Sequence, residues 1–239
     1  MKTIILYLLL LLTASAEELV WSDEFNGVSL NSTRWNVNTD KRHSAINSKE
    51  AVVVKNGMLQ IKTFTRGEQH YSGLIDTAGK FEISGGRLLI RAKFNDQPGT
   101  WSCGWLYTHT AGEDNQDVNK HGMEVDVFEH RLFDMYRKDI SDVVNHTLHW
   151  YGYGKYHKCA ATDTTIKKNE FNIFELRWTK DRYEFFVNGK QTWTASPVTT
   201  KPLFLILSTE VGFIDFWTQP LLKEYNHTTL LVDYIRYYK

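Results

Sequence analysis

Apolar and polar residues alternate with a period of two along most of this 239-residue chain, and this pattern restricts the fold more than any other feature. In an extended strand, successive side chains point to opposite faces, so such alternation builds sheets with one buried face. No stretch of twelve or more residues keeps the 3.6-residue period of an amphipathic helix. The chain therefore predicts an all-β protein.

Seven segments carry the alternation most clearly and are bounded by Gly, Asn, Asp or Pro. They are MLQIKTF (58–64), GRLLIRAKF (86–94), MEVDVF (123–128), FNIFELRW (171–178), YEFFVNG (183–189), LFLILST (203–209) and TLLVDYIRYY (229–238). Asn56-Gly57 and Asn188-Gly189 are two-residue hairpin signals. Strands at short intervals, without a repeat or a linker, predict one sandwich of two antiparallel sheets. We expect loops at 34–50, 108–121 and 151–169, where the pattern is weak.

The first 16 residues have the three parts of a secretory signal peptide. A lysine precedes an apolar run from Ile4 to Leu12, and the small residues Ala14-Ser15-Ala16 follow. The run is too short to span a bilayer. We expect cleavage after Ala16, a single catalytic domain at 17–239, and secretion to an extracellular or periplasmic location.

Charge and cysteine content limit the partners and the cross-links. The full chain has 28 basic and 28 acidic residues, a balance that predicts neither nucleic acid nor a membrane surface as partner, and we expect a monomer. Cys103 and Cys159 allow one disulfide in an exported protein, and a buried free thiol at Cys103 is equally compatible. Sequons at Asn31, Asn145 and Asn226 matter only in a host that glycosylates.

The segment GMEVDVFEH (122–130) contains three carboxylates whose spacing conflicts with a regular strand. Glu124 and Asp126 are two apart and share a face, whereas Glu129 is five from Glu124 and should point the opposite way. One extra residue, Val127 or Phe128, in a β-bulge would bring Glu129 back to the first face. The alternative is that the three carboxylates lie on a solvent-exposed strand face and have no catalytic role.

With the bulge, the spacing suits glycoside hydrolysis. That reaction uses two carboxyl groups, about 5 Å apart when the anomeric configuration is retained. Four regular steps separate the two Glu backbones by about 13 Å, and side chains that lean inward by about 4 Å each bring the carboxyls to that separation. The motif therefore predicts a retaining enzyme only if the bulge exists.

EVDVFE (124–129) resembles the bulged E-x-D-x-x-E signature of glycoside hydrolase family 16, in its laminarinase-like branch. Further segments resemble the family in the same order: LVWSDEFNG (19–27), YSGLIDTAGKFEISGGRLLIRAKF (71–94), GTWSCGWL (99–106), FELRWTKDRYEFFVNGK (174–190) and LLVDYIRYYK (230–239). The resemblance covers nearly the whole mature chain. It implies a concanavalin-like jelly-roll sandwich that hydrolyses polysaccharides.

The resemblance also implies roles for single residues. Glu124 matches the nucleophile, Asp126 the assisting carboxylate that hydrogen-bonds the nucleophile, and Glu129 the general acid/base. Trp105 matches a tryptophan beneath the nucleophile. The reaction requires no cofactor, but the resemblance implies a structural Ca²⁺ ion that involves Asp233.

Other aromatic and imidazole side chains are candidates for binding sugar. Trp101 is a candidate stacking platform, with a place in the core as the alternative. His146, Trp150 and Trp217 are also candidates to line the cleft, although a structural role suits His146 equally well.

The motif resemblance leaves the substrate open. We expect an endo-β-1,3- or β-1,3(4)-glucanase. The laminarinase-like members usually have Trp-Pro where this chain has VNKHGM (118–123), and an Asn where it has Ala51. A galactanase acting on agar- or carrageenan-like chains is therefore an alternative, and a non-catalytic, lectin-like glycan binder is another.

Overall fold

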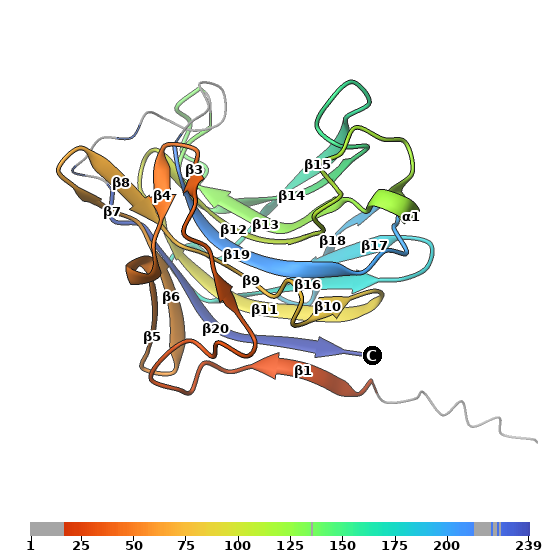
Figure 1. Ribbon diagram of the computed structural model, residues 1–239, viewed down its shortest axis with the longest axis horizontal. Coiled ribbons are helices and arrows are strands. Elements are labelled where there is room, and N and C mark those ends of the chain that lie inside the picture. The colour runs from red at the N-terminus through yellow and green to blue at the C-terminus, as the bar shows by residue number, and fades with distance from the viewer. Residues whose placement is uncertain (1–16, 135, 213–220, 222–223, 225) are drawn as a thin grey trace, which may run out of the picture.

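The strands of the computed structural model form two large sheets packed face to face (Figure 1). The residues it describes are 17–134, 136–212, 221, 224 and 226–239. The outer sheet has the order β18-β17-β16-β11-β20-β6-β5, with β1 also paired to β20. Its strands are β1 (Leu19–Asp23), β5 (Val52–Lys55), β6 (Met58–Lys62), β11 (Gly86–Asn95), β16 (Asn172–Trp178), β17 (Tyr183–Val187), β18 (Lys190–Ala195) and β20 (Thr229–Tyr238).

The inner sheet has the order β15-β14-β13-β12-β19-β9-β2, with β10 also paired to β19. Its strands are β2 (Asn36–Val37), β9 (Leu74–Asp76), β10 (Glu82–Ile83), β12 (Thr100–Tyr107), β13 (Glu124–Arg131), β14 (Val143–Trp150), β15 (Lys158–Thr165) and β19 (Leu203–Val211). All strand pairs in both large sheets are antiparallel. The expected sandwich is confirmed.

A third, small sheet of order β3-β4-β8-β7 stands at one end of the inner sheet, and the loop between β14 and β15 lies at the other end (Figure 1). Its strands are β3 (Lys41–Arg42), β4 (Ala45–Asn47), β7 (Phe64–Arg66) and β8 (Gln69–Ser72). The described helices are the short 3₁₀ turn η1 (Lys49–Ala51) and α1 (Val118–His121). In the part of the chain that the structure describes, no helix has the length and apolarity needed to cross a bilayer.

All seven predicted strand segments contain a strand. Both predicted hairpins are present, and the two residues of each turn have positive φ, as a type I′ turn requires. The prediction of a loop throughout 151–169 is wrong, because residues 158–165 form the edge strand β15. The sequence KCAATDTT consists of small and polar residues, so it shows no hydrophobic periodicity. Likewise, 34–50 contains β2, β3, β4 and part of η1, and 108–121 contains α1.

The core lies between the two large sheets and is made of alternate residues from each. On β11, Leu88, Ile90, Ala92 and Phe94 are buried, while the intervening residues are not. This is the packing expected of an antiparallel sandwich, in which each sheet has one face on the core.

Candidate active site

β13 contains the bulge that its carboxylate spacing requires. Asp126 and Glu129 pair with residues of β14 that are only two apart, at positions 147 and 145. On the other side, Phe128 pairs with Gly104 of β12 and Asp126 with the very next residue, so Val127 has no partner there. The alternation of faces is therefore reset between Asp126 and Glu129, as predicted.

The residues around the bulge divide between the two faces of the inner sheet. Val125, Val127 and Phe128 are at most 1% exposed and belong to the sandwich core. The three carboxylates lie on the opposite face, where they line a cleft of about 640 Å³. Two adjacent core residues at Val127 and Phe128 thus place Glu129 on the same side as Glu124.

The cleft is built from the adjacent strands β15, β14, β13, β12 and β19 of the inner sheet, together with the small sheet and the β14–β15 loop. Its lining residues are Arg42, His43, Trp101, Cys103, Trp105, Tyr107, Glu124, Asp126, Glu129, Asn145, Thr147, His149, Tyr153, Cys159, Ala161 and Glu210.

Glu124 receives a hydrogen bond from a residue outside its own sheet. The hydroxyl of Tyr153, in the β14–β15 loop, donates to Glu124 Oε2 over 2.5 Å. Burial raises the Glu124 pKa to about 7, while this bond and the positive charge of Arg42 oppose the rise. Glu124 is therefore a carboxyl that titrates near neutral pH.

Asp126 is the most enclosed of the three carboxylates. It is 4% exposed, and its Oδ2 atom has no hydrogen-bond partner among the described residues. Burial and the charges of Glu124 and Glu129 raise its pKa well above the ordinary value for Asp. The expected hydrogen bond to Glu124 is not among the bonds of the described structure, although the two side chains have oxygens within 4.8 Å of each other.

Glu129 lies beyond the bulge and receives a weaker contact. Thr147 Oγ1 donates to Glu129 Oε2 over 3.2 Å. Burial, and after it the charge of Glu124, raises the Glu129 pKa to about 7, while Arg131 and the Thr147 bond oppose the rise. Glu124 and Glu129 thus both bind protons more strongly than ordinary carboxyl groups, and they repel each other when both are ionised.

An imidazole pair lies beside the first two carboxylates. His149 Nε2 is 3.8 Å from Asp126 Oδ2 and 4.0 Å from Glu124 Oε1. Its Nδ1 is hydrogen-bonded to His157 Nε2 at 3.0 Å, and the two rings are stacked. Burial, reinforced by His157, lowers the His149 pKa to about 4, so this imidazole is neutral at neutral pH.

Next to the small sheet, the wall of the cleft contains the Arg42–Glu210 ion pair, which packs against Trp105. Arg42 Nε donates to both oxygens of Glu210 at 2.9 Å, and Glu210 is only 2% exposed. The Arg42 guanidinium lies 5.4 Å from the centre of the Trp105 ring. The ion pair holds the Arg42 guanidinium near Glu124, and the negative charge of Glu210 opposes the effect of Arg42 on Glu124.

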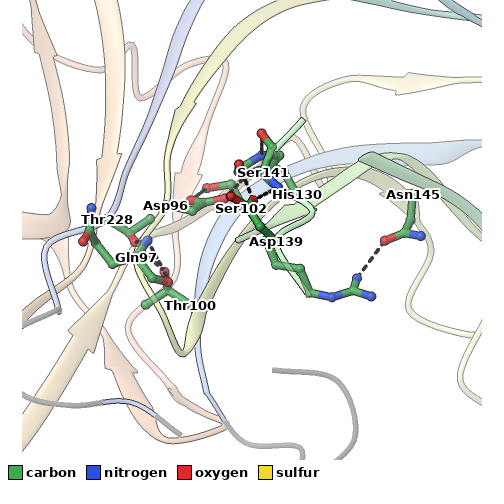
Figure 2. Close-up of polar contacts among 10 residues, drawn as sticks. Asp96, Gln97, Thr100, Ser102, His130, Asp139, Ser141, Asn145 and Thr228 are labelled. Carbon is green, nitrogen blue, oxygen red and sulfur yellow. Dashed lines mark hydrogen bonds and ion pairs between the residues drawn. The ribbon is translucent and has the colours of Figure 1, made fainter. Parts of the chain in front are cut away.

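Buried hydrogen bonds hold the end of β13 from the core side. His130, which follows Glu129, bonds through Nδ1 to Asp96 Oδ2 at 2.6 Å and through Nε2 to the Ser141 carbonyl at 3.0 Å (Figure 2). Ser102 donates to the other oxygen of Asp96 over 2.5 Å. These bonds tie β12, β13 and the segment before β14 together directly behind Glu129.

Two of the predicted sugar-binding residues lie in the cleft, and two do not. Trp101 and Trp105 line it, but they are only 5% and 7% exposed and belong to a second buried hydrophobic cluster, so Trp101 also has the core place that was its alternative. His146 is 1% exposed and faces the core, so its assignment to the cleft is wrong. Trp150 has the same orientation and packs against the core, outside the set of cleft-lining residues. Trp217 lies outside the described residues.

Register explains the error at His146. Thr147 pairs with Asp126 and therefore shares its face, so the cleft receives the odd-numbered residues 145, 147 and 149 of β14. His146 instead donates from Nδ1 to the carbonyl of Val127 over 2.6 Å, which satisfies a backbone group of the bulge. The β14 histidine that lines the cleft is His149, which a parity count from Asp126 would identify once the pairing is known.

The remaining sequence predictions concern the two cysteines and a metal ion. Cys103 and Cys159 are both free thiols, and Cys103 is buried. Asp233 forms an ion pair with Arg91, and the calcium prediction remains untested. Among described residues, one group of His and acidic side chains has metal-like proximity, namely Glu124, Asp126 and His149. We assign it no metal, because its carboxylates are those of the motif.

The sequence profile of glycosyl hydrolases family 16 matches residues 38–204, which include the small sheet, the bulge and most of the cleft. The chain belongs to glycosyl hydrolases family 16. A solved structure, the laminarinase from Flavobacterium sp. UMI-01, superposes with a TM-score of 0.76 at 22% identity, covering 93% of this chain and 100% of that one. At that identity the superposition supports the fold.

Two curated relatives differ in the polysaccharide that their names state. Glucan endo-1,3-beta-glucosidase A1 of Niallia circulans is 26% identical over 92% of this chain and 38% of its own length. Keratan-sulfate endo-1,4-beta-galactosidase of Sphingobacterium multivorum is 24% identical over 93% of this chain and 55% of its own length. The chain thus spans only 38% and 55% of the length of these two relatives.

Proposed function

We propose that this protein is an exported, retaining hydrolase that cuts β-glycans within the chain, with Glu124 as nucleophile and Glu129 as general acid/base. The observation that carries the proposal is the bulge at Val127, because it alone places both glutamates on the cleft face. Raised carboxyl pKa values support it, since the acid must keep a proton near neutral pH.

The reaction takes two steps. A Glu124 oxygen attacks the anomeric carbon as the glycosidic C–O bond breaks, and the Glu129 proton moves to the departing oxygen. Water then attacks the same carbon, its proton moves to Glu129, and the bond to Glu124 breaks. Asp126 supports Glu124 from the same strand, and the exposed edges of Trp101 and Trp105, both largely buried, give the cleft wall apolar surface next to which a sugar ring can lie.

β-1,3-Glucan or mixed β-1,3/1,4-glucan is our first substrate candidate. The bulged motif and the likeness to a glucan endo-1,3-beta-glucosidase support it. A β-galactan is the second candidate, because a keratan-sulfate endo-1,4-beta-galactosidase is almost equally similar. The loss of the usual Trp-Pro before the motif also favours a cleft adapted to another glycan.

One digestion series tests the proposal. Purified protein is incubated with laminarin, mixed-linkage glucan, agarose, carrageenan and keratan sulfate, and oligosaccharide products are analysed by chromatography and mass spectrometry. Glu124→Gln is the matched inactive control. The first-formed reducing end should show the β-anomer by proton NMR. Binding without products from any of these polysaccharides would support the lectin-like alternative, and an initial α-anomer would exclude the retaining mechanism.

A further inference from the structure

The two glutamates need one proton between them, and it must sit on Glu129. Ionised Glu124 with protonated Glu129 is active, whereas the reverse arrangement has neither nucleophile nor acid in its place. Burial is the largest cause that raises the pKa of each glutamate, and because it acts on both it does not choose between the two arrangements. A contact that distinguishes the two side chains must make the choice.

Tyr153 makes the shortest contact to either glutamate. Its hydroxyl donates to Glu124 Oε2 over 2.5 Å, whereas the Thr147 hydroxyl lies 3.2 Å from Glu129. A donated hydrogen bond stabilises the ionised form of its acceptor. The difference between the bonds therefore favours ionised Glu124, and it leaves Glu124 Oε1 free to attack.

The loop that carries Tyr153 is held in place from both sides. The Tyr156 backbone N–H donates to Asp114 Oδ1 over 3.1 Å, and Gly154 packs so closely on that carboxylate that a Cβ would lie 2.8 Å from it. His149 and His157 flank the Tyr153 ring, with centroids 5.9 and 5.4 Å away. The hydroxyl is thus positioned by neighbouring contacts before a substrate enters.

The effects of the other charged neighbours are partly offset or favour the opposite arrangement. Arg42 favours ionised Glu124, but its partner Glu210 opposes that effect. Arg131 favours ionised Glu129, the inactive arrangement. Among the described residues, the ionisable or charged groups that line the cleft or act on the pair are Arg42 of β3 and His43 after it, Cys103 and Tyr107 of β12, Asp126 and Arg131 of β13, His149 of β14, Tyr153 and His157 of the following loop, Cys159 of β15, and Glu210 of β19.

We propose that the Tyr153 hydroxyl keeps the single proton of the pair on Glu129 by donating a hydrogen bond to ionised Glu124. Tyr153 is then a positioning residue, and the inference rests on the proposed function of the two glutamates. In the second step the same bond stabilises the charge that returns to Glu124 as its bond to the sugar breaks. No proton leaves Tyr153 in either step.

Two opposing variants test the proposal. Tyr153→Phe removes the donor to Glu124, so we expect the maximum of kcat/KM across pH to fall about tenfold, as the proton moves to Glu124 in part of the molecules. Thr147→Val removes the donor to Glu129 and raises that pKa. Its maximum should rise, because more of the molecules then hold the proton on Glu129, and its basic limb should move upward by about half a pH unit.

Tyr156→Phe is the matched control, because Tyr156 is in the same loop but has its backbone, not its hydroxyl, in the contact with Asp114. Its pH profile should match that of the wild type. A Tyr153→Phe maximum equal to the wild type, or equal losses in Tyr153→Phe and Thr147→Val, would overturn the proposal.

A readout without turnover separates this inference from the proposed function. ¹³C NMR of Glu-labelled protein, with the Glu124 carboxyl assigned by Glu124→Gln, should show Glu124 titrating at higher pH in Tyr153→Phe. An unchanged titration overturns the inference even in an active enzyme. If the wild type cleaves no polysaccharide, the proposed function fails, and the NMR shift still decides where the proton lies.

Discussion

The ring of Phe128 occupies the space that a side chain on Gly104 would need. The two residues pair across β12 and β13, and a Cβ on Gly104 would lie 2.5 Å from the ring. Phe128 is one of the two core-facing residues at the bulge, so the absence of a side chain at position 104 allows the bulge to pack. The catalytic spacing in β13 thus depends on a glycine in the neighbouring strand.

Gly104→Ala should therefore disturb both stability and activity. The added methyl group has no free space, because its closest neighbour is a fully buried ring rather than a flexible side-chain end. We expect a loss of about 1 to 3 kcal/mol in the free energy of unfolding, typical of overpacking, and reduced kcat. Urea unfolding and initial rates measure the two effects. Gly27→Ala, at an exposed site, should change neither substantially.

Deleting Val127 should convert β13 to a regular strand in which all three carboxylates still face the cleft. Glu124, Asp126 and the acid would then stand at relative positions 0, 2 and 4, all on one face, and Phe128 would stay opposite Gly104. We expect a folded variant, less stable because a buried valine is lost, with more activity than Glu129→Ala.

Deleting both Val127 and Phe128 is the contrasting variant. It directs the acid toward the core, where an ionisable group is costly, so it should be inactive and unstable. Circular dichroism must first establish folding. Activity in the double deletion together with none in a folded single deletion would show that face parity does not control the position of Glu129.

His146→Phe should destabilise the bulge without touching the cleft. The substitution keeps an aromatic ring beside Phe185 but leaves the Val127 carbonyl without its imidazole donor. An unsatisfied buried carbonyl costs about 1 to 3 kcal/mol, which thermal or urea unfolding will detect. His149→Phe is the comparison in the cleft, and it should affect rate more than stability. If His146→Phe lowered the rate more than the stability, and His149→Phe the stability more than the rate, His146 would have to be assigned to the active site after all.

Glu124→Gln and Glu129→Gln should each lower kcat by at least about a thousandfold, because each removes a covalent or proton-transfer role. Asp126 gives a finer test. Since its raised pKa favours the protonated form, Asp126→Asn keeps a donor at this position and should be more active than Asp126→Ala. Near-normal turnover in Glu124→Gln would contradict the assignment.

The carboxyl cluster should also make stability depend on pH. Folding raises the pKa of Glu129 from 4.5 to about 7, so between these values the folded protein holds a proton that the unfolded chain has released. The free energy of unfolding should therefore fall as pH rises through this window, by about 3 kcal/mol from this group. Glu129→Gln should flatten the curve, whereas Glu170→Gln, at an exposed site, should leave its slope unchanged.

The sequence by itself determined the sheets and the identity of the motif. Period-two alternation depends only on the geometry of an extended chain, so the segments that became β6, β11, β16, β19 and β20 were recognisable from their own residues. The spacing of Glu124, Asp126 and Glu129 also carried the bulge, because only an extra residue reconciles it with one shared face. β15 escaped notice because an edge strand with small residues buries too little apolar surface to show a period.

Only the tertiary structure decided which partners the motif receives. Whether His146 or His149 faces the cleft depends on the register between β13 and β14, and register is a property of paired strands rather than of either strand alone. Arg42 reaches Glu210 across 168 residues of sequence, and Tyr153 reaches Glu124 from a loop held by Asp114. Such long-range contacts produce no local sequence pattern, because they do not depend on the residues that are adjacent in the sequence.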